Sequence, residues 1–202
     1  MSSFKASSAG LQSAPLKLRI RQIESVEQFQ PFSAGITALL QFHQSTLRDD
    51  FSQQDIQQLV QNTLTYVPWL WVLTDDAEFP KEKPLNSTTG FSVYGLACLS
   101  DIIPGRHAYV HGASHPAIRR HPAISELGHW VLYVAFQQLK VRKVKAEIEA
   151  NNWGAKGYCR RMGFVREAHF RQDIRINGQW QDVLVYSLFA EKFQPLSPEI
   201  SC

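Results

Sequence analysis

The sequence predicts a mixed α/β domain, and three kinds of pattern support this prediction. Segments in which apolar and charged residues alternate indicate half-buried strands, most clearly over 143–149. Segments with apolar residues at i, i+3 and i+4 indicate amphipathic helices. Asn177-Gly178, between two long segments rich in β-forming residues, favours a two-residue hairpin. A length of 202 residues suits one sizeable core, so we expect a single domain.

In the first half of the chain, two alternating or apolar segments predict strands and two periodic segments predict helices. Ser52 and Asp55 form an arrangement similar to a capping box, and Pro68 ends the helix that follows. The expected elements are a strand at 16–22, a helix from 26 to about 48, a helix from 52 to 68, a strand at 69–73 and a loop over 75–90.

The second half of the chain is richer in turn and cap signals. Pro104-Gly105 indicates a turn between two strands, and Pro122 suits the first turn of a helix. Asn152 is a candidate helix cap, and Gly163 is well placed to end the same helix. The expected elements are strands at 91–100 and 107–113, a helix at 122–139, a strand at 143–149, a helix ending near 162, and a hairpin of 164–176 with 180–189.

Composition excludes some broad classes. The chain is 44% hydrophobic and 19% charged, as expected for a folded domain. Its net charge of +3 is too small, without a dense basic stripe, to predict nucleic-acid binding. No apolar run approaches the roughly 18 residues that a membrane span needs, so we expect no membrane partner.

Cysteine use and the two ends of the chain set further expectations. Cys98, Cys159 and Cys202 are odd in number and far apart, so they predict neither a disulfide framework nor a zinc site. We therefore expect no metal and a cytoplasmic location. Residues 1–15 lack the apolar region of a secretory signal and are expected to form a flexible tail, with the domain over 16–190 and a second tail over 191–202.

Four segments, in this order, resemble a known family. They are Gly95–Gly105, the strand ending in Asn151-Asn152, Met162-Gly163-Phe164, and the turn Asn177-Gly-Gln-Trp-Gln-Asp182. Together they are similar to the GCN5-related N-acetyltransferase (GNAT) superfamily, and closest to the branch that includes the ribosomal-protein N-terminal acetyltransferases. The resemblance covers about 16–189 and is firm after residue 90.

The resemblance implies a fold, a co-substrate and a reaction. The fold would be a central mixed twisted sheet of about seven strands flanked by helices. Acetyl-CoA, as co-substrate, would lie in a V-shaped opening between the strands at 107–113 and 143–149. The reaction would move an acetyl group to a primary amine by direct attack in a ternary complex. The acceptor would be a small-molecule amine or a protein N-terminus, and the sequence does not distinguish them.

One segment departs from the family. A glycine-rich pattern normally surrounds the pyrophosphate, but Pro122 stands at the first glycine and has no N–H to donate. Arg119, Arg120 and His121 could supply charged contacts instead, or could simply form a solvated loop. The resemblance implies cofactor contacts at Val110, His111, Gly112, Arg119, Arg120, His121, Ala123, Ile124, Ser125, Asn152, Lys156 and Cys159.

The catalytic groups are also unusual for the family. No acidic residue lies between His107 and Ala123, so the glutamate that relatives often carry on the fourth strand is absent. His111 and His115 are the candidate bases, and the simpler alternative is that both are packing or exposed residues. Tyr158 is the candidate acid for the leaving thiolate, although Cys159 occupies the position at which relatives place a tyrosine.

Two functions therefore stay open. The first is the N-acetyltransferase, and the second is a catalytically weak or inactive GNAT-like module that binds acyl-CoA or a protein partner. The altered phosphate segment and the missing glutamate favour the second, whereas catalysis by positioning alone would allow the first. The oligomeric state is open, with a homodimer among the options.

Overall fold

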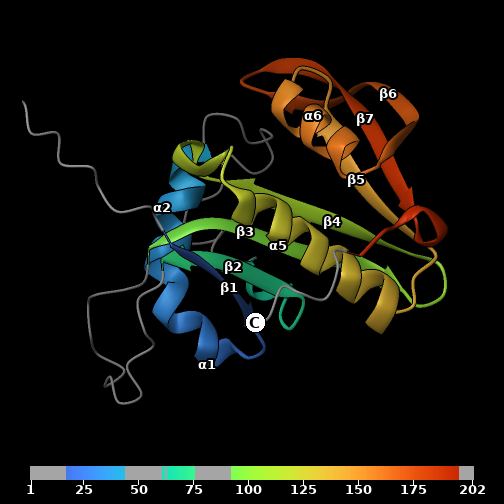
Figure 1. The fold of residues 1–202 in the computed structure, drawn as a ribbon. Helices are drawn as coiled ribbons and strands as arrows, with labels where there is room; N and C mark the ends of the chain where they lie inside the picture. Colours follow the sequence, from blue (N-terminus) through green and yellow to red (C-terminus); the bar gives the residue numbers. More distant parts are fainter. Residues whose placement is uncertain (1–16, 44–60, 62, 76–91, 196–202) are drawn as a thin grey trace, which may run out of the picture.

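The computed structural model describes residues 17–43, 61, 63–75 and 92–195. They form a seven-stranded sheet in the order β1-β2-β3-β4-β5-β7-β6, in which β4 and β5 are parallel and the other neighbours antiparallel (Figure 1). The strands are β1 (Leu18–Ile23), β2 (Leu70–Asp75), β3 (Val93–Ile103), β4 (His107–Ser114), β5 (Lys143–Glu149), β6 (Val165–Ile176) and β7 (Gln179–Phe189). The predicted mixed α/β fold is confirmed.

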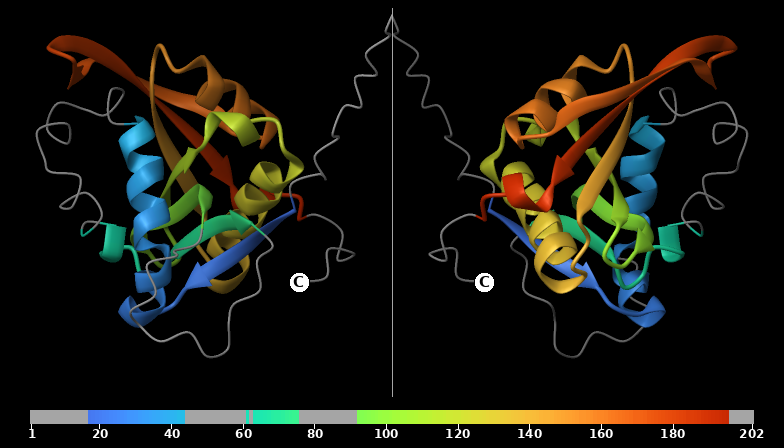
Figure 2. Two further views of the ribbon diagram at one scale, coloured as in Figure 1. Left: turned by 90° about the vertical axis from the view of Figure 1, so that its left-hand side faces the viewer. Right: turned by 90° about the vertical axis from the view of Figure 1, so that its right-hand side faces the viewer.

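Helices cover both faces of the sheet (Figure 2). On one face lie α1 (Val26–Phe29) and α2 (Ser33–His43), and on the other lies α5 (Pro122–Tyr133). Strand β2 shows the division, because side chains alternate along a strand. Trp71 and Leu73 join the core under α5, whereas Leu70 and Val72 join the core under α1 and α2. The sheet is therefore the middle layer between two hydrophobic cores.

Over 26–43, the first helix differs from the expectation of one continuous helix, and the rest of that expected helix, up to about residue 48, lies outside the described residues. It runs as α1, a 3-10 turn (Gln30–Phe32) and then α2. Pro31 lies in the 3-10 turn, and its missing N–H removes a bond that an α-helix would make there. Most of the second expected helix, over 52–68, lies outside the described residues, although Gln61, Thr63 and Leu64 are helical.

The helix expected over 122–139 changes its hydrogen bonding near its end. α5 stops at Tyr133 and a π-helix follows over Val134–Gln138, closed by a 2.9 Å bond from the Leu139 N–H to the Val134 carbonyl. The short helix α6 (Trp153–Arg161) has Asn152 as its cap, as predicted: the Asn152 Oδ1 accepts from the Ala155 N–H at 3.0 Å.

The C-terminal hairpin confirms its predicted turn. Asn177 and Gly178 both have positive φ, 50° and 75°, as the favoured hairpin turn requires. After β7 the chain turns through Ala190–Lys192, and Phe193 packs on Phe136 with 5.1 Å between ring centroids. Phe193 therefore packs on the domain although it lies within 191–202, the segment expected to form a tail. Within the described parts, no helix is both long and apolar enough to cross a membrane.

Candidate active site

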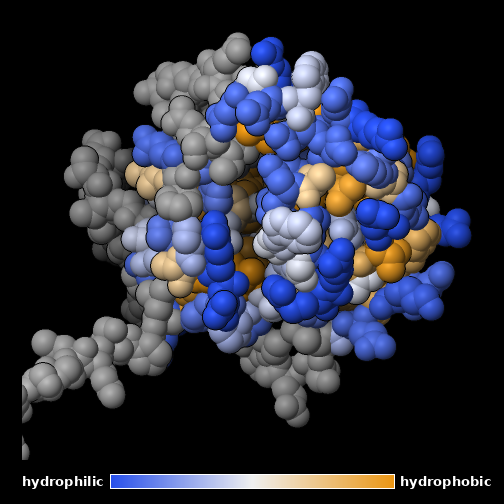
Figure 3. Space-filling model, turned by 90° about the horizontal axis from the view of Figure 1, so that it is seen from above, coloured by the Kyte–Doolittle hydropathy of each residue, from blue (hydrophilic) through white to orange (hydrophobic). Residues whose placement is uncertain are grey.

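The central feature of the site is the divergence of the two parallel strands. The β4–β5 ladder consists of the Cα pairs His107–Lys143, Ala108–Val144 and Tyr109–Lys145. Both strands continue beyond this ladder, β4 to Ser114 and β5 to Glu149. Figure 1 shows them adjacent at their starts and well separated at their ends. Seen from above, in Figure 3, hydrophobic atoms lie at the bottom of a hollow flanked by hydrophilic side chains.

The direction of the β4 backbone groups follows from its pairing with β3. The His115 N–H donates to the Tyr94 carbonyl at 2.7 Å, and the antiparallel register is unbroken from there to the Ser100–Tyr109 pair. Backbone groups of successive residues in a strand point to opposite edges, so His115 and His111 bond towards β3. Val110 and Gly112 consequently direct their N–H and C=O groups into the opening between β4 and β5.

Three side chains form a hydrogen-bonded series beside the opening. Ser100 Oγ donates to Asp101 Oδ2 at 2.9 Å, and it lies 2.8 Å from Nε2 of His111. Because the one hydroxyl proton goes to the carboxylate, Ser100 accepts from a protonated Nε2, which leaves Nδ1 of His111 as the basic nitrogen. Asp101 reaches this position from an irregular point of β3, where its φ is 46°.

The surroundings of His111, whose side chain is partly open to solvent, favour the neutral form of its ring. Desolvation by the surrounding protein lowers the pKa of His111, and the charge of Asp101 opposes this with a smaller effect. The ring also lies 5.9 Å from that of Tyr66, centroid to centroid. Since Cys98 is its cross-strand partner, His111 shares the sheet face that α2 covers. A neutral imidazole on this face can accept a proton near neutral pH.

The backbone amides of the segment at 115–125 form hydrogen bonds within the segment, which the sequence did not predict. Pro122 occupies the first turn of α5, the Ala123 N–H donates to Nδ1 of His121 at 3.2 Å, and the Ile124 N–H donates to the His121 carbonyl at 3.1 Å. A phosphate would have to displace these acceptors to use the same amides. Arg119, Arg120 and Ser125 are exposed at this end of the helix.

Two histidines, His115 and His43, lie at this end of β4. Nδ1 of His115 caps the 3-10 turn Pro116–Ile118 by accepting from the Ala117 N–H at 3.3 Å. His43 lies 3.1 Å from the Ser114 carbonyl. Burial lowers the pKa of His43, and the charges of Arg119 and His115 lower it further. His115 thus serves as a cap, and its role as a base stays a prediction.

The expected contacts on α6 are engaged within the protein. The Tyr158 hydroxyl donates to the Ile124 carbonyl at 3.0 Å, and burial raises the pKa of Tyr158 to about 12. The buried Lys156 amine donates to the Ala150 carbonyl and lies 3.5 Å from the centroid of the Trp153 ring. Cys159 is buried, and this raises the pKa of its thiol to about 11, so it is a poor nucleophile.

The structure therefore brings some predicted residues together and adds others. Val110, His111 and Gly112 line the diverging part of β4, whereas Tyr158 is tied to the first turn of α5. Sequence reasoning missed Ser100 and Asp101 as partners of His111. The sequence did contain part of the information, because the Pro-Gly turn predicts that β3 pairs with β4. Locating the contact also required the irregular pairing after Ser100, which the sequence did not predict.

Known structures share this architecture at low sequence identity. Neither the protein-family models nor the curated protein sequences give a match to this chain. A mutant of the spermidine N-acetyltransferase SpeG from Vibrio cholerae is similar with a TM-score of 0.65 and 19% identity, over 87% of this chain and 95% of that one. The ribosomal-protein-S5-alanine acetyltransferase from Vibrio fischeri is similar with a TM-score of 0.62 and 16% identity, over 88% and 96%. The diverging parallel strands, the sheet order and these likenesses together show that the chain has the fold of the GNAT acetyltransferases.

Proposed function

We propose that the protein is an acetyl-CoA-dependent N-acetyltransferase that moves an acetyl group to a primary amine by direct attack in a ternary complex. The observation that carries this proposal is the early end of the β4–β5 ladder, which leaves amide groups of Val110 and Gly112 directed into an opening. Such an edge can pair with the amides of a pantetheine arm, and Arg119 and Arg120 lie on the loop that follows β4.

The reaction needs an acceptor for one proton and stabilisation of one developing charge. The amine nitrogen attacks the thioester carbonyl carbon, the C–N bond forms, and the C–S bond breaks to release the thiolate of CoA. Nδ1 of His111 takes the proton that the amine loses, while Ser100 and Asp101 hold the ring through Nε2. An N–H of Val110 or Gly112 stabilises the carbonyl oxygen as it gains negative charge.

The protonation of the leaving thiolate has one candidate side chain. Tyr158 keeps its proton at neutral pH, since burial raises its pKa to about 12. To act as the acid it must release the Ile124 carbonyl, to which it donates at 3.0 Å. Water can protonate the thiolate if Tyr158 stays in place, so Tyr158 is not required for the proposed mechanism.

The second candidate function is an acyl-CoA-binding module without turnover. The observation in its favour is that the backbone at the start of α5, where the pyrophosphate is expected, has few amides to offer. Pro122 has no N–H, and the amides of Ala123 and Ile124 already donate to His121. Both functions predict binding of acetyl-CoA, and only the transferase predicts its consumption.

Turnover of the thioester separates the two candidates. We expect the purified protein to release CoA thiol from acetyl-CoA when it is given a mixture of small amines and short peptides with free N-termini, and mass spectrometry should find an acetylated product. Binding of acetyl-CoA without thiol release above the rate of the protein-free control would contradict the transferase and favour the module.

A further inference from the structure

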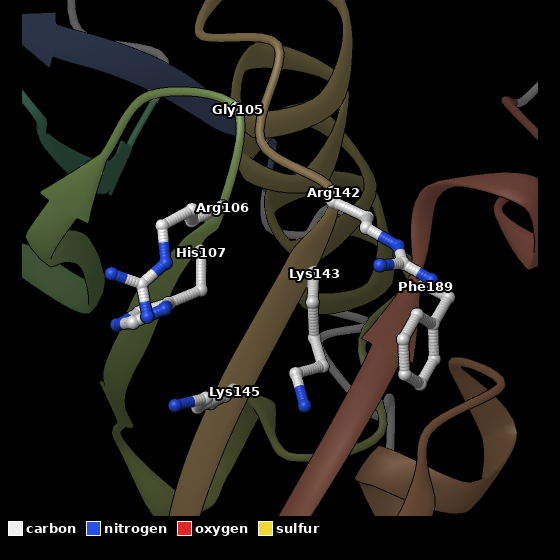
Figure 4. Close-up of a pocket in the computed structure, with 7 residues that line it drawn as sticks. All are labelled: Gly105, Arg106, His107, Arg142, Lys143, Lys145 and Phe189. Carbon is white, nitrogen blue, oxygen red and sulfur yellow. The ribbon is translucent and has the colours of Figure 1, made fainter.

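A basic pocket lies on the face of the sheet that carries His111, at the start of the two parallel strands (Figure 4). It has a volume of about 350 Å³ and opens to solvent. Its lining residues are Gly105, Arg106, His107, Arg142, Lys143, Lys145 and Phe189, and none of them belongs to the predicted cofactor or catalytic set.

The charges around this pocket are strongly unbalanced. Four cationic side chains line it, and one of them, Lys143, is paired with Glu167 at 2.9 Å, which also accepts from the Ser187 hydroxyl at 2.6 Å. Within the described parts of the chain, Arg106 and Arg142 have no ion-pair partner. Desolvation lowers the pKa of His107, the charges of Lys145, Arg106 and Lys143 lower it further, and the charge of Asp101 opposes them with a smaller effect. The pocket therefore favours a negatively charged ligand.

The pocket adjoins the proposed reaction site. Lys145 lines the pocket and also forms, with Tyr109, the last pair of the β4–β5 ladder. Beyond this pair the strands diverge, and His111 follows two residues later, on the same face of β4 as Tyr109. A ligand that fills the pocket can therefore extend along the sheet to the opening.

The charge on the exposed face of β5 changes from positive to negative where the β4–β5 ladder ends. Val144, Ala146 and Ile148 pack into the core under α5, so the residues between them face the other way. That other face carries Lys143 and Lys145 beside the ladder, and then glutamates at 147 and 149 beyond it. An ammonium group would be attracted to the diverging end and an anion to the pocket.

We propose that the basic pocket binds a carboxylate or phosphate of the acceptor, so that the substrate is a primary amine with an anionic group about 7 to 13 Å from the nitrogen, the length of two to four strand residues. This inference rests on the proposed transferase function, because only that function makes the ligand of the pocket an acceptor. It excludes polyamines, whose positive charges the pocket would repel, as good substrates. A single amino acid is too short to span both ends.

The test compares acceptors that differ only in their anionic group. The first arm uses C-terminally amidated tetrapeptides with a free N-terminal serine and either two glutamates, two glutamines or two arginines at the third and fourth positions. The second arm uses a hexosamine with and without a phosphate on its far carbon, and spermidine serves as the polycation. The arm that shows a preference identifies whether a peptide or a small molecule supplies the anion.

The variant Arg106→Gln/Arg142→Gln removes two pocket charges, and Arg166→Gln, an exposed arginine of β6, is the matched control. We expect wild-type and control proteins to acetylate an anionic acceptor with kcat/KM about tenfold above its neutral counterpart, and the double variant to lose this preference. Equal or better turnover of the neutral or cationic acceptors by the wild type would overturn the proposal. So would an unchanged preference in the double variant.

Equilibrium titration of the same acceptors separates failure of this proposal from failure of the transferase function. If no acceptor is acetylated but the anionic ones bind more tightly to wild type than to the double variant, the pocket stands as an anion site and the transferase function fails. If the anionic acceptors bind equally to both proteins, or to neither, the pocket proposal fails whatever the turnover shows.

Discussion

At the scale of single residues, the proposed reaction depends on His111 and on the two side chains that hold it. A base on this strand must be neutral near physiological pH and must keep one nitrogen available. Desolvation lowers the pKa of His111, and the bond at Nε2 leaves Nδ1 for the substrate. In the proposed mechanism Ser100 and Asp101 are positioning residues, because they would act on the amine only through the imidazole.

Replacing His111 should therefore reduce the chemical step. We expect His111→Gln to lower kcat about a hundredfold or more while the affinity for acetyl-CoA stays near that of the wild type, because general-base catalysis contributes at least about this factor. Steady-state kinetics together with titration of acetyl-CoA check this. An unchanged kcat would mean that another group, or water alone, accepts the proton.

The pH profile provides a readout specific to Asp101. A base with a lowered pKa is active above that pKa, so activity should fall only below the usual histidine value of about 6.5. Asp101 raises the pKa of His111, so Asp101→Asn should move this acidic limb to lower pH. Asparagine also tolerates the positive φ of 46°. Asp173→Asn, a change of an exposed carboxylate on β6, should leave the limb in place, and equal limbs in both variants would refute the coupling.

At the scale of elements, the packing of α6 on α5 decides how rigid this side of the opening is. The Tyr158 hydroxyl passes over Gly128, where a Cβ atom would lie 1.9 Å from its oxygen, and donates to the Ile124 carbonyl. The absence of a side chain at residue 128 lets the two helices approach closely. It also fixes Tyr158 away from the role of acid unless the contact opens.

Substitution at this contact should destabilise the protein. We expect Gly128→Ala to lower the free energy of unfolding by about 1 to 3 kcal/mol, the usual cost of overpacking, and Tyr158→Phe to recover part of the loss by removing the clashing oxygen. Gly157→Ala is the control, because its Cβ would meet only Arg161 Nη1, at 3.6 Å, and alanine favours a helix. The measurement is urea denaturation of the wild type, Gly128→Ala, Gly128→Ala/Tyr158→Phe and Gly157→Ala. A Gly128→Ala protein as stable as the wild type would contradict the prediction and show that Tyr158 can move aside at little cost.

The elements also show which features the sequence could predict. Strand β5 matched its expected bounds because its alternation is regular, and the hairpin followed from Asn177-Gly178. The first helix was predicted too simply, since Pro31 lies within it and its effect on hydrogen bonding was overlooked. The contact of His111 with Ser100 and the basic pocket could not be predicted, because both depend on cross-strand register and on the end of the β4–β5 ladder.

At the scale of the whole molecule, the two halves of the sheet meet only at the start of β4 and β5 and then separate. One half carries the basic segment after β4, and the other carries α6 and the hairpin (Figure 1). We propose that acetyl-CoA binds in the opening between them, with its phosphates near Arg119 and Arg120, and that the acceptor binds on the face that carries His111. The small net charge of +3 conceals this division into local basic regions.

Isothermal titration with acetyl-CoA tests the central claim most directly. We expect roughly micromolar binding to the wild type, weakened about tenfold in Arg119→Ala/Arg120→Ala and unchanged in the β6 control Arg166→Ala. Only the first pair lies at the expected phosphate position. Binding that persists undiminished in the double variant would place the phosphates elsewhere. No detectable binding at millimolar acetyl-CoA would contradict the account and leave a GNAT fold that does not use this co-substrate.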